Sequence, residues 1–206
     1  PRVNAIKCTP THLSLLEVGQ SYQAALQLLV VGGEALHEAE VRKVQQLFPE
    51  LRVVNEYGPT EATVGCIAQA IEHRRNLQAV KETIGKPLPG MQVLLLRDDM
   101  EVNYTQLGAP SPSGELYLAG EGLSPGYLHA SELTSQRFVT RPGTPELRLY
   151  QTGDRAHYNE QGVLVYEGRT DQQVKHKGYR IELSGIARQL EHLKEVQHAH
   201  VLLSKT

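Results

Sequence analysis

The sequence has few cysteines, no large charge excess and no long apolar run, and each shortage excludes a class of protein. Its two cysteines, Cys8 and Cys66, lack the paired spacing of a zinc site or a disulfide framework. The 21 basic and 23 acidic residues leave a net charge of −2, which creates no field that favours nucleic acid or an anionic membrane. No apolar run reaches about 18 residues, and residues 1–4 do not resemble a signal peptide. We therefore expect a soluble cytoplasmic protein without a nucleic-acid or membrane partner.

Two apolar segments flank a helical segment near the start of the chain. Leu26 to Val31 predicts a buried strand that stops at Gly32-Gly33, and Leu51 to Val54 predicts a second strand. Ala35 to Leu47, between them, carries apolar residues at helical spacing. Such a strand–helix–strand unit has parallel strands and a right-handed crossover, so both strands end on the same edge of a sheet. We expect this edge to bring the two glycines beside Glu56-Tyr57-Gly58.

The composition changes after about residue 85. Short segments with alternating apolar residues, divided by Pro, Gly and Asp, predict an antiparallel sheet or barrel: Gln92 to Leu96, Gly114 to Ala119, Leu147 to Tyr150 and Gly162 to Glu167. The glycines from Gly120 to Gly126 superficially resemble a dinucleotide fingerprint, but no amphipathic helix opens there, so we expect no cofactor loop. From Asp171 the chain becomes charged, and Ile181 to Leu193 predicts a helix.

The segment Asn55-Glu56-Tyr57-Gly58-Pro59-Thr60-Glu61 combines the side chains that a nucleotide site needs. Because Gly58-Pro59 breaks the strand, we expect Tyr57, Thr60 and Glu61 on a loop at its carboxyl end, where open α/β sheets bind ligands. An aromatic face can cover a base, a hydroxyl can meet a phosphate oxygen, and a carboxylate can hold Mg²⁺. The alternative is a solvated turn with a helix-capping threonine.

Four separated segments together resemble the adenylate-forming enzymes, and in particular the adenylation domains of nonribosomal peptide synthetases. They are the Asn55 to Glu61 segment, Gly114-Glu115-Leu116-Tyr117 with Gly126-Tyr127-Leu128, Tyr150-Gln151-Thr152-Gly153-Asp154, and Gly168 to Lys175 with Gly178 to Leu183. The resemblance implies an incomplete adenylate-forming fold of the α/β class. Residues 1–170 would be the C-terminal part of the large core, with an α/β sheet portion (1–85) and a β-barrel-like portion (86–170). Residues 171–206 would begin a small, mobile α+β domain.

The resemblance also implies an activity. The family converts a carboxylic acid and Mg·ATP to an acyl-adenylate and passes the acyl group to a phosphopantetheine thiol on a carrier domain. Carrier and condensation domains of the same megasynthase would be the partners. Two alternatives stay open: an acyl-CoA ligase of the same superfamily, and a non-catalytic nucleotide-binding module. Gly185 and Ala187 stand where the family usually has carboxylates, and this loss favours the non-catalytic nucleotide-binding module.

Roles in nucleotide binding follow from the resemblance position by position. Tyr57 corresponds to the residue that stacks on adenine, with Asn55 near the amino edge of the base and Gly33-Glu34 below the ring. Thr60 corresponds to the phosphate-contacting hydroxyl and Glu61 to the Mg²⁺ ligand.

Three further positions correspond to the ribose contacts and to the hinge. Asp154 matches the carboxylate that accepts both ribose hydroxyls, and Arg169 matches the arginine that contacts ribose and phosphate. Asp171 matches the hinge about which the small domain moves. The alternatives are a turn aspartate for Asp154 and a simple linker residue for Asp171.

The same resemblance locates the pocket that selects the acid, at Lys7, Val30, Gly32, Glu56, Val64 and Gly65. A buried Lys7 needs an acceptor and a buried Glu56 needs a donor. One carboxamide satisfies both, so the pocket predicts asparagine as the substrate, with glutamine and aspartate as competitors. The alternative is that Lys7 and Glu56 pair with each other and shape a pocket for another acid.

The resemblance further implies that the family's phosphate loop and its aspartate for the α-amino group precede this sequence, and that its C-terminal lysine follows it. Without these groups the triphosphate and the developing charge lose most of their partners, so we expect little adenylation by the 206 residues alone. We also expect an unpaired sheet edge where the preceding strands would lie.

Overall fold

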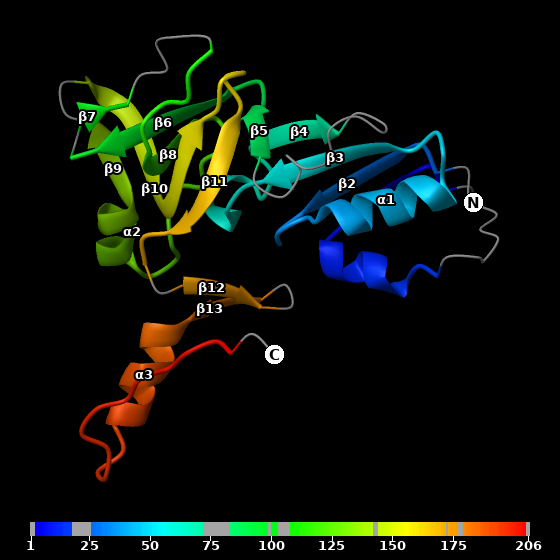
Figure 1. Ribbon diagram of the computed structural model, residues 1–206. Helices are drawn as coiled ribbons and strands as arrows, with labels where there is room; N and C mark the ends of the chain where they lie inside the picture. Colours follow the sequence, from blue (N-terminus) through cyan, green and yellow to red (C-terminus); the bar gives the residue numbers. More distant parts are fainter. Residues whose placement is uncertain are drawn as a thin grey trace.

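The computed structural model describes residues 3–17, 26–71, 83–98, 100–102, 108–141, 144–171, 173–176 and 179–204 (Figure 1). In chain order its elements are β1 (Ala5–Cys8), η1 (Pro10–Leu15, a 3₁₀ helix), β2 (Leu28–Gly32), α1 (Glu38–Leu47), β3 (Arg52–Tyr57), η2 (Thr60–Ala62, a 3₁₀ turn), β4 (Ile67–Ile71), β5 (Thr83–Pro87), β6 (Met91–Arg97), β7 (Met100–Glu101), β8 (Gly114–Gly120), α2 (Ser131–Arg137), β9 (Phe138–Arg141), β10 (Thr144–Tyr158), β11 (Leu164–Arg169), β12 (Gln173–His176), β13 (Tyr179–Glu182) and α3 (Leu183–Glu191).

The first part of the chain forms the strand–helix–strand unit that its apolar pattern predicts. β2 pairs with β3 in parallel, and the register places Gly32 opposite Glu56. Both α1 and η1 lie on the same side of these strands (Figure 1), and Val41 and Val44 of α1 are buried in a core that also contains Leu13 of η1. The three-residue spacing of the two valines puts them on one helix face, so their burial fixes the helix against the sheet.

The strand that carries the nucleotide motif is longer than its apolar pattern predicts. β3 continues through Tyr57 because β4 pairs with it antiparallel, and Tyr57 stands opposite Ile67. Tyr57 is therefore the last residue of a strand, whereas we expected it on a loop. Thr60 and Glu61 do follow the strand, in η2, and the next two residues, Thr63 and Val64, have left-handed backbone with φ of 60° and 65°. A β-branched residue in this region is strained, so the surrounding structure must hold the turn in place.

The β-rich portion is an open sheet that continues the first one. Its strands pair antiparallel, as predicted, and the path of paired strands runs β1-β2-β3-β4-β5-β11-β10-β8-β6-β7, with β9 beside β10. The predicted α/β class is confirmed. Among the described residues the path of paired strands does not close, so they form an open sheet rather than a closed barrel. β10 is much longer than the predicted segment from Leu147 to Tyr150, and its register shifts between Gln151 and Arg155, where Gly153 lies.

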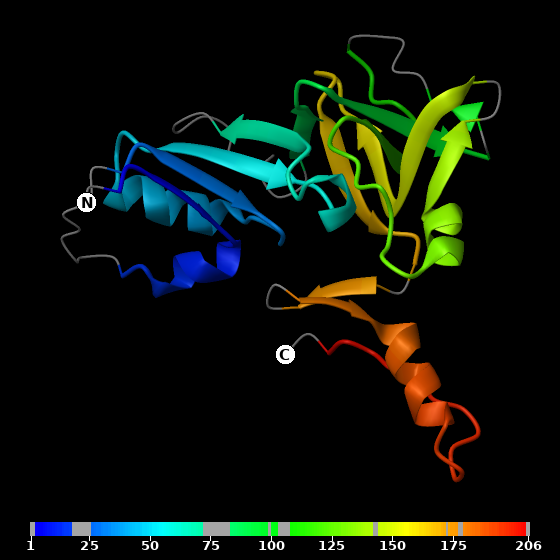
Figure 2. The same ribbon diagram turned by 180° about the vertical axis from the view of Figure 1, so that it is seen from behind.

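The last elements form a hairpin and a helix. β12 and β13 pair antiparallel, and α3 follows directly, so the first two residues of the predicted helix from Ile181 belong to β13 instead. In both views this hairpin and α3 lie below the two portions of the large sheet (Figures 1 and 2). No residue of α3 is buried. Within the described part of the chain, no helix combines the length and the apolar character needed to cross a membrane.

Candidate active site

The ends of several strands and the irregular middle of β10 surround one cavity of about 190 Å³. β2, β3, β10, β11 and β12 or the residues just after them contribute its lining, which consists of Gly33, Tyr57, Gly58, Pro59, Thr60, Val64, Asp154, Arg169, Gln173 and Val174. Five residues predicted to contact the nucleotide, Gly33, Tyr57, Thr60, Asp154 and Arg169, therefore meet here, together with Val64 from the predicted substrate pocket. The parallel strands bring the first three together, and the antiparallel strands bring the other two.

A buried hydrogen bond joins the two motifs at this cavity. Tyr57 and Asp154, which are 97 residues apart, are only 8% and 6% exposed, and the Tyr57 hydroxyl donates to Oδ2 of Asp154. Nη1 of Arg169 donates to the other carboxylate oxygen at 2.7 Å. Burial, and then the neighbouring Asp154 carboxylate, raise the pKa of Tyr57 well above its ordinary value, so its hydroxyl keeps the proton that it donates.

Arg169 connects this carboxylate to the predicted hinge. Its Nε and Nη2 donate to the two oxygens of Asp171 at 2.6 and 2.7 Å, and Nη2 also donates to the Thr152 carbonyl at 3.0 Å. Burial by itself raises the pKa of Asp171, but the bonds from Arg169 and from the Gln173 amide outweigh it and leave the pKa below its usual value. A two-point arginine–carboxylate contact of this kind fixes both side chains.

The predicted metal ligand lies just outside the cavity lining. Glu61 is 8% exposed, and its Oε1 accepts a hydrogen bond from the Tyr127 hydroxyl at 2.6 Å. The Ser124 amide donates to the Glu61 carbonyl at 2.8 Å, which fixes the backbone of η2. No group of three or more His, Cys, Asp or Glu side chains suited to a metal occurs among the described residues.

Two residues predicted to lie beside adenine are engaged elsewhere and do not line the cavity. Nδ2 of Asn55 donates to the Thr83 carbonyl at 3.0 Å. Oε2 of Glu34 accepts from the amide and the hydroxyl of Thr11, at 3.0 and 2.6 Å. Both side chains thus connect the edge of the sheet to neighbouring segments.

The predicted substrate pocket is assembled mainly on one face of β1 to β3. Lys7 pairs with Val30, and Gly32 pairs with Glu56, while Val30 and Gly32 are two residues apart; all four therefore share a face. Lys7 Nζ lies 2.5 Å from Glu56 Oε2, with side-chain exposures of 53% and 13%. The structure thus contains the direct ion pair that formed the alternative interpretation of these charges.

The two remaining pocket positions follow η2. A Cβ on Gly65 would lie 2.1 Å from Cδ of Glu56, so the missing side chain makes room for this glutamate. Val64 lines the cavity that contains Tyr57 and is half-exposed. Gly65 therefore belongs to the Lys7–Glu56 group, whereas Val64 borders the nucleotide cavity.

Sequence reasoning missed several residues around the cavity. The ring of Tyr166 lies 6.3 Å from that of Tyr57, and burial followed by the Asp154 carboxylate raises its pKa to about 12. Gln173 and Val174 of β12 line the cavity, although the sequence motif around them suggested only a hinge. Tyr166 stands three residues before Arg169, outside the quoted motif, so only the pairing of β11 with β10 identifies it.

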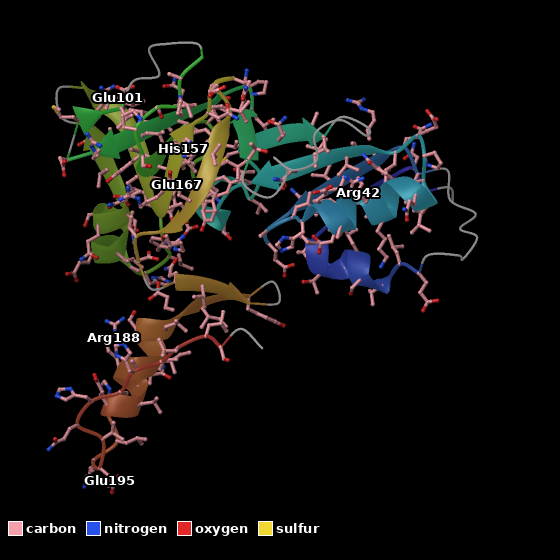
Figure 3. The ribbon with its side chains drawn as sticks, in the orientation of Figure 1. Arg42, Glu101, His157, Glu167, Arg188 and Glu195 are labelled. Carbon is pink, nitrogen blue, oxygen red and sulfur yellow. The ribbon has the colours of Figure 1, made fainter. Side chains whose placement is uncertain are left out.

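A surface group on β10 and β11 lies apart from the cavity. His157 and Glu167, which Figure 3 labels on neighbouring strands, contact each other through Nδ1 and Oε1 at 2.7 Å. Ser113 donates to the same oxygen of Glu167 at 2.7 Å. Because Glu167 accepts both contacts, no hydroxyl faces a histidine base here, and the group serves to join strands.

Comparison with known proteins shows which sequences this chain is similar to. The family model described as AMP-binding enzyme matches residues 2–128. Bacitracin synthase 3 of Bacillus licheniformis is 37% identical over 201 residues, which cover 97% of this chain and 3% of the synthase. Tyrocidine synthase 3 of Brevibacillus parabrevis is 36% identical over 205 residues, covering 99% of this chain and 3% of that protein.

A solved structure extends the similarity to three dimensions. An NRPS protein containing adenylation and PCP domains superposes with a TM-score of 0.83 at 32% identity, covering 98% of this chain and 40% of the other. The chain therefore spans a small part of the synthetases that it matches and less than half of the solved chain. From the matched motifs, the shared fold and these similarities, we conclude that the chain belongs to the AMP-binding enzyme family, among the adenylation domains of nonribosomal peptide synthetases.

Proposed function

We propose that the protein activates an amino acid with ATP in nonribosomal peptide synthesis. The carboxylate oxygen of the amino acid attacks the α-phosphorus and pyrophosphate leaves. The sulfur of a phosphopantetheine thiol on a carrier domain then attacks the acyl carbon of the aminoacyl-adenylate, which forms a thioester and releases AMP and the thiol proton. The observation that carries this proposal is the meeting of Tyr57, Asp154 and Arg169 at one cavity. A ring, a ribose acceptor and a cation at the rim of a sheet are suited to adenosine monophosphate.

Each cavity residue has a role in this proposal. The Tyr57 ring forms a wall for adenine. Gly33 also lines the cavity, and because it has no side chain it leaves space for the base. Asp154 accepts the ribose hydroxyls, since an ionised carboxylate accepts several hydrogen bonds at once. Thr60 donates its hydroxyl to a phosphate oxygen, and Arg169 offers a cation to phosphate while holding Asp154. Glu34 and Asn55 act indirectly, by fixing the edge on which the base rests.

Nucleotide entry requires movement at β12. The cavity of about 190 Å³ is smaller than the roughly 300–1,000 Å³ of typical ligand pockets. Gln173 and Val174 form one wall, and Asp171 stands two residues before Gln173, the first residue of their strand. We propose that residues 1–170 belong to the large core and residues 171–206 to the small mobile domain, so that rotation about Asp171 opens this wall.

Glu61 fits a magnesium ion that arrives with the nucleotide. Mg²⁺ is usually held by one or two carboxylates together with substrate phosphates and water, rather than by an all-protein cage. A single buried carboxylate beside the cavity matches this mode. When bound, the ion neutralises phosphate charge, and the part of this chain is to orient the Glu61 carboxylate toward it.

We propose asparagine as the amino acid. Lys7 and Glu56 present a donor and an acceptor 2.5 Å apart at the rim of the sheet, with Gly65 leaving room beside Glu56. A carboxamide would accept from Lys7 and donate to Glu56, whereas the carboxylate of aspartate would meet the charge of Glu56. The direct ion pair favours the competing proposal, in which the two charges neutralise each other and the pocket accepts a different amino acid.

Pyrophosphate exchange into ATP tests both levels of the proposal. With the protein in its natural length, we expect exchange that depends on an added amino acid and is fastest with asparagine. Glu56→Gln removes the charge that excludes aspartate, so the preference for asparagine over aspartate falls; Glu38→Gln, which removes a charge on the exposed face of α1, serves as the matched control.

The two levels fail in different ways. Exchange with another amino acid and none with asparagine would refute the asparagine assignment alone. Exchange that responds only to fatty or aryl acids would indicate the acyl-CoA ligase, and binding of ATP without exchange would indicate the non-catalytic module.

A further inference from the structure

The glycine-rich loop between β8 and α2 holds the turn that carries Glu61. We call residues 120–128 the clasp loop. Three hydrogen bonds connect it to residues 61–63: the Thr63 hydroxyl to the Gly122 carbonyl at 2.6 Å, the Ser124 amide to the Glu61 carbonyl at 2.8 Å, and the Tyr127 hydroxyl to Glu61 Oε1 at 2.6 Å. The loop that superficially resembles a dinucleotide fingerprint therefore supports a neighbouring carboxylate.

Tyr127 is itself fixed from two sides. Its ring packs edge-on against Phe138, with centroids 5.8 Å apart, and its amide donates to the Thr134 hydroxyl at 2.9 Å. This approach requires the glycine before it. Gly126 has φ of +144°, and a Cβ there would lie 2.4 Å from the methyl carbon of Thr134. Packing and backbone contacts thus hold the ring of Tyr127 in place, and its hydroxyl interacts with Tyr150 as well as with Glu61.

We propose that Tyr127 is a positioning residue that orients the Glu61 carboxylate toward the Mg²⁺ of the nucleotide; this rests on the proposed function. A neutral hydroxyl fixes the plane of the carboxylate without cancelling its charge, whereas a lysine or arginine here would compete with the metal. Hydrogen-bond partners of metal ligands typically change metal affinity or activity by about 10- to 100-fold when removed. Glu61 is 8% exposed, so solvent cannot readily replace this donor.

Manganese binding provides the direct test, with the protein in its natural length and a non-hydrolysable ATP analogue present. We expect Tyr127→Phe to raise the Kd for Mn²⁺, measured by electron paramagnetic resonance, by about 10- to 100-fold. In pyrophosphate exchange, the half-saturating Mg²⁺ concentration should rise while the rate at saturating Mg²⁺ stays close to that of the wild type.

The matched control is Tyr117→Phe. Tyr117 also contacts a glutamate through its hydroxyl, at 3.4 Å from Glu115, but lies on β8 away from the cavity. Its loss should leave the Kd for Mn²⁺ unchanged. Should Tyr127→Phe not fold, Thr134→Val takes its place, because it removes the acceptor of the Tyr127 amide without touching Glu61; a smaller rise in the same Kd is then expected.

The outcomes separate this inference from the function on which it rests. The positioning role is overturned if the Kd for Mn²⁺ is unchanged in Tyr127→Phe, or in Thr134→Val if that variant is used. This holds even where Glu61→Gln abolishes Mn²⁺ binding and the wild type exchanges pyrophosphate normally. A wild-type protein that exchanges no pyrophosphate with any amino acid overturns the proposed function instead.

Discussion

Removing one hydroxyl from the cavity tests the contact on which the site depends. Tyr57→Phe keeps the ring, and leaves Asp154, only 6% exposed, without the Tyr57 donor. Hydrogen bonds to charged groups contribute about 1.5–3 kcal/mol net, so we expect the free energy of unfolding to fall by about that amount. The bond to Arg169 remains and limits the loss, because the carboxylate still has a cation at 2.7 Å.

A double-mutant cycle isolates this contact from other effects of the substitution. Urea unfolding, followed by circular dichroism, is measured for the wild type, Tyr57→Phe, Asp154→Asn and the double variant. The interaction energy of the cycle should lie in the same range of about 1.5–3 kcal/mol, since the two side chains touch directly. Tyr179→Phe, on the exposed surface of β13, is the control and should change stability by no more than about 0.5 kcal/mol.

One result would refute the reasoning. An interaction energy within about 0.5 kcal/mol of zero is what distant, independent sites show. It would mean that the two motifs do not meet in the folded protein, and the nucleotide site built on them would have to be abandoned.

Three more expectations follow from packing and ionisation. Gly65→Ala puts a Cβ 2.1 Å from Cδ of Glu56, so the flexible end of this glutamate must move and its ion pair with Lys7 is disturbed. We expect a loss of no more than about 1 kcal/mol in urea unfolding together with an altered amino-acid preference, and an unchanged preference would contradict this contact. The pKa of Asp171 is lowered by Arg169, so its stabilising effect is present above the unfolded pKa of about 3.9 and lost as pH falls through the folded pKa. The stability difference between wild type and Asp171→Asn should therefore shrink below about pH 4, and a difference that is constant with pH would argue against the ion pair. Burial and Asp154 raise the pKa of Tyr166 to about 12, so the contribution of its neutral phenol to stability is complete below about pH 10 and lost as pH rises toward 12. In an ultraviolet titration, Tyr166→Phe should lack one late-ionising phenol of the wild type. If the missing phenol is instead one that titrates near pH 10, the shift is disproved.

The local elements were predictable where periodicity decides them. The buried strand before Gly32, the helix that contains Val41 and Val44, and the parallel strand after it all occur with shifted ends. The ends shift because pairing extends strands beyond their apolar runs: β4 carries β3 on through Tyr57. Residues 120–128 show the opposite case. Their glycines resembled a dinucleotide fingerprint, but nothing in the sequence indicated that Tyr127 would contact Glu61, 66 positions away.

The sequence likewise contains the side chains that the site needs, but it does not show where the fold places them. The motifs named Tyr57, Asp154 and Arg169 together, and the fold brings them to one cavity. Asn55 and Glu34 were expected beside the base, and the fold gives their side chains hydrogen bonds to Thr83 and Thr11. A motif records which side chains are present, but the partner of a polar side chain is whichever group the fold brings within about 3 Å.

The sequence by itself therefore determined the strand–helix–strand unit and the set of groups able to bind a nucleotide, and its four motifs carried the resemblance to the family. Only the tertiary structure decided that the Tyr57 hydroxyl donates to Asp154 across 97 residues, that Lys7 pairs with Glu56, and that Tyr127 holds Glu61. The reason is that periodicity reports interactions within a few residues, whereas these contacts depend on strand order and register in one continuous sheet.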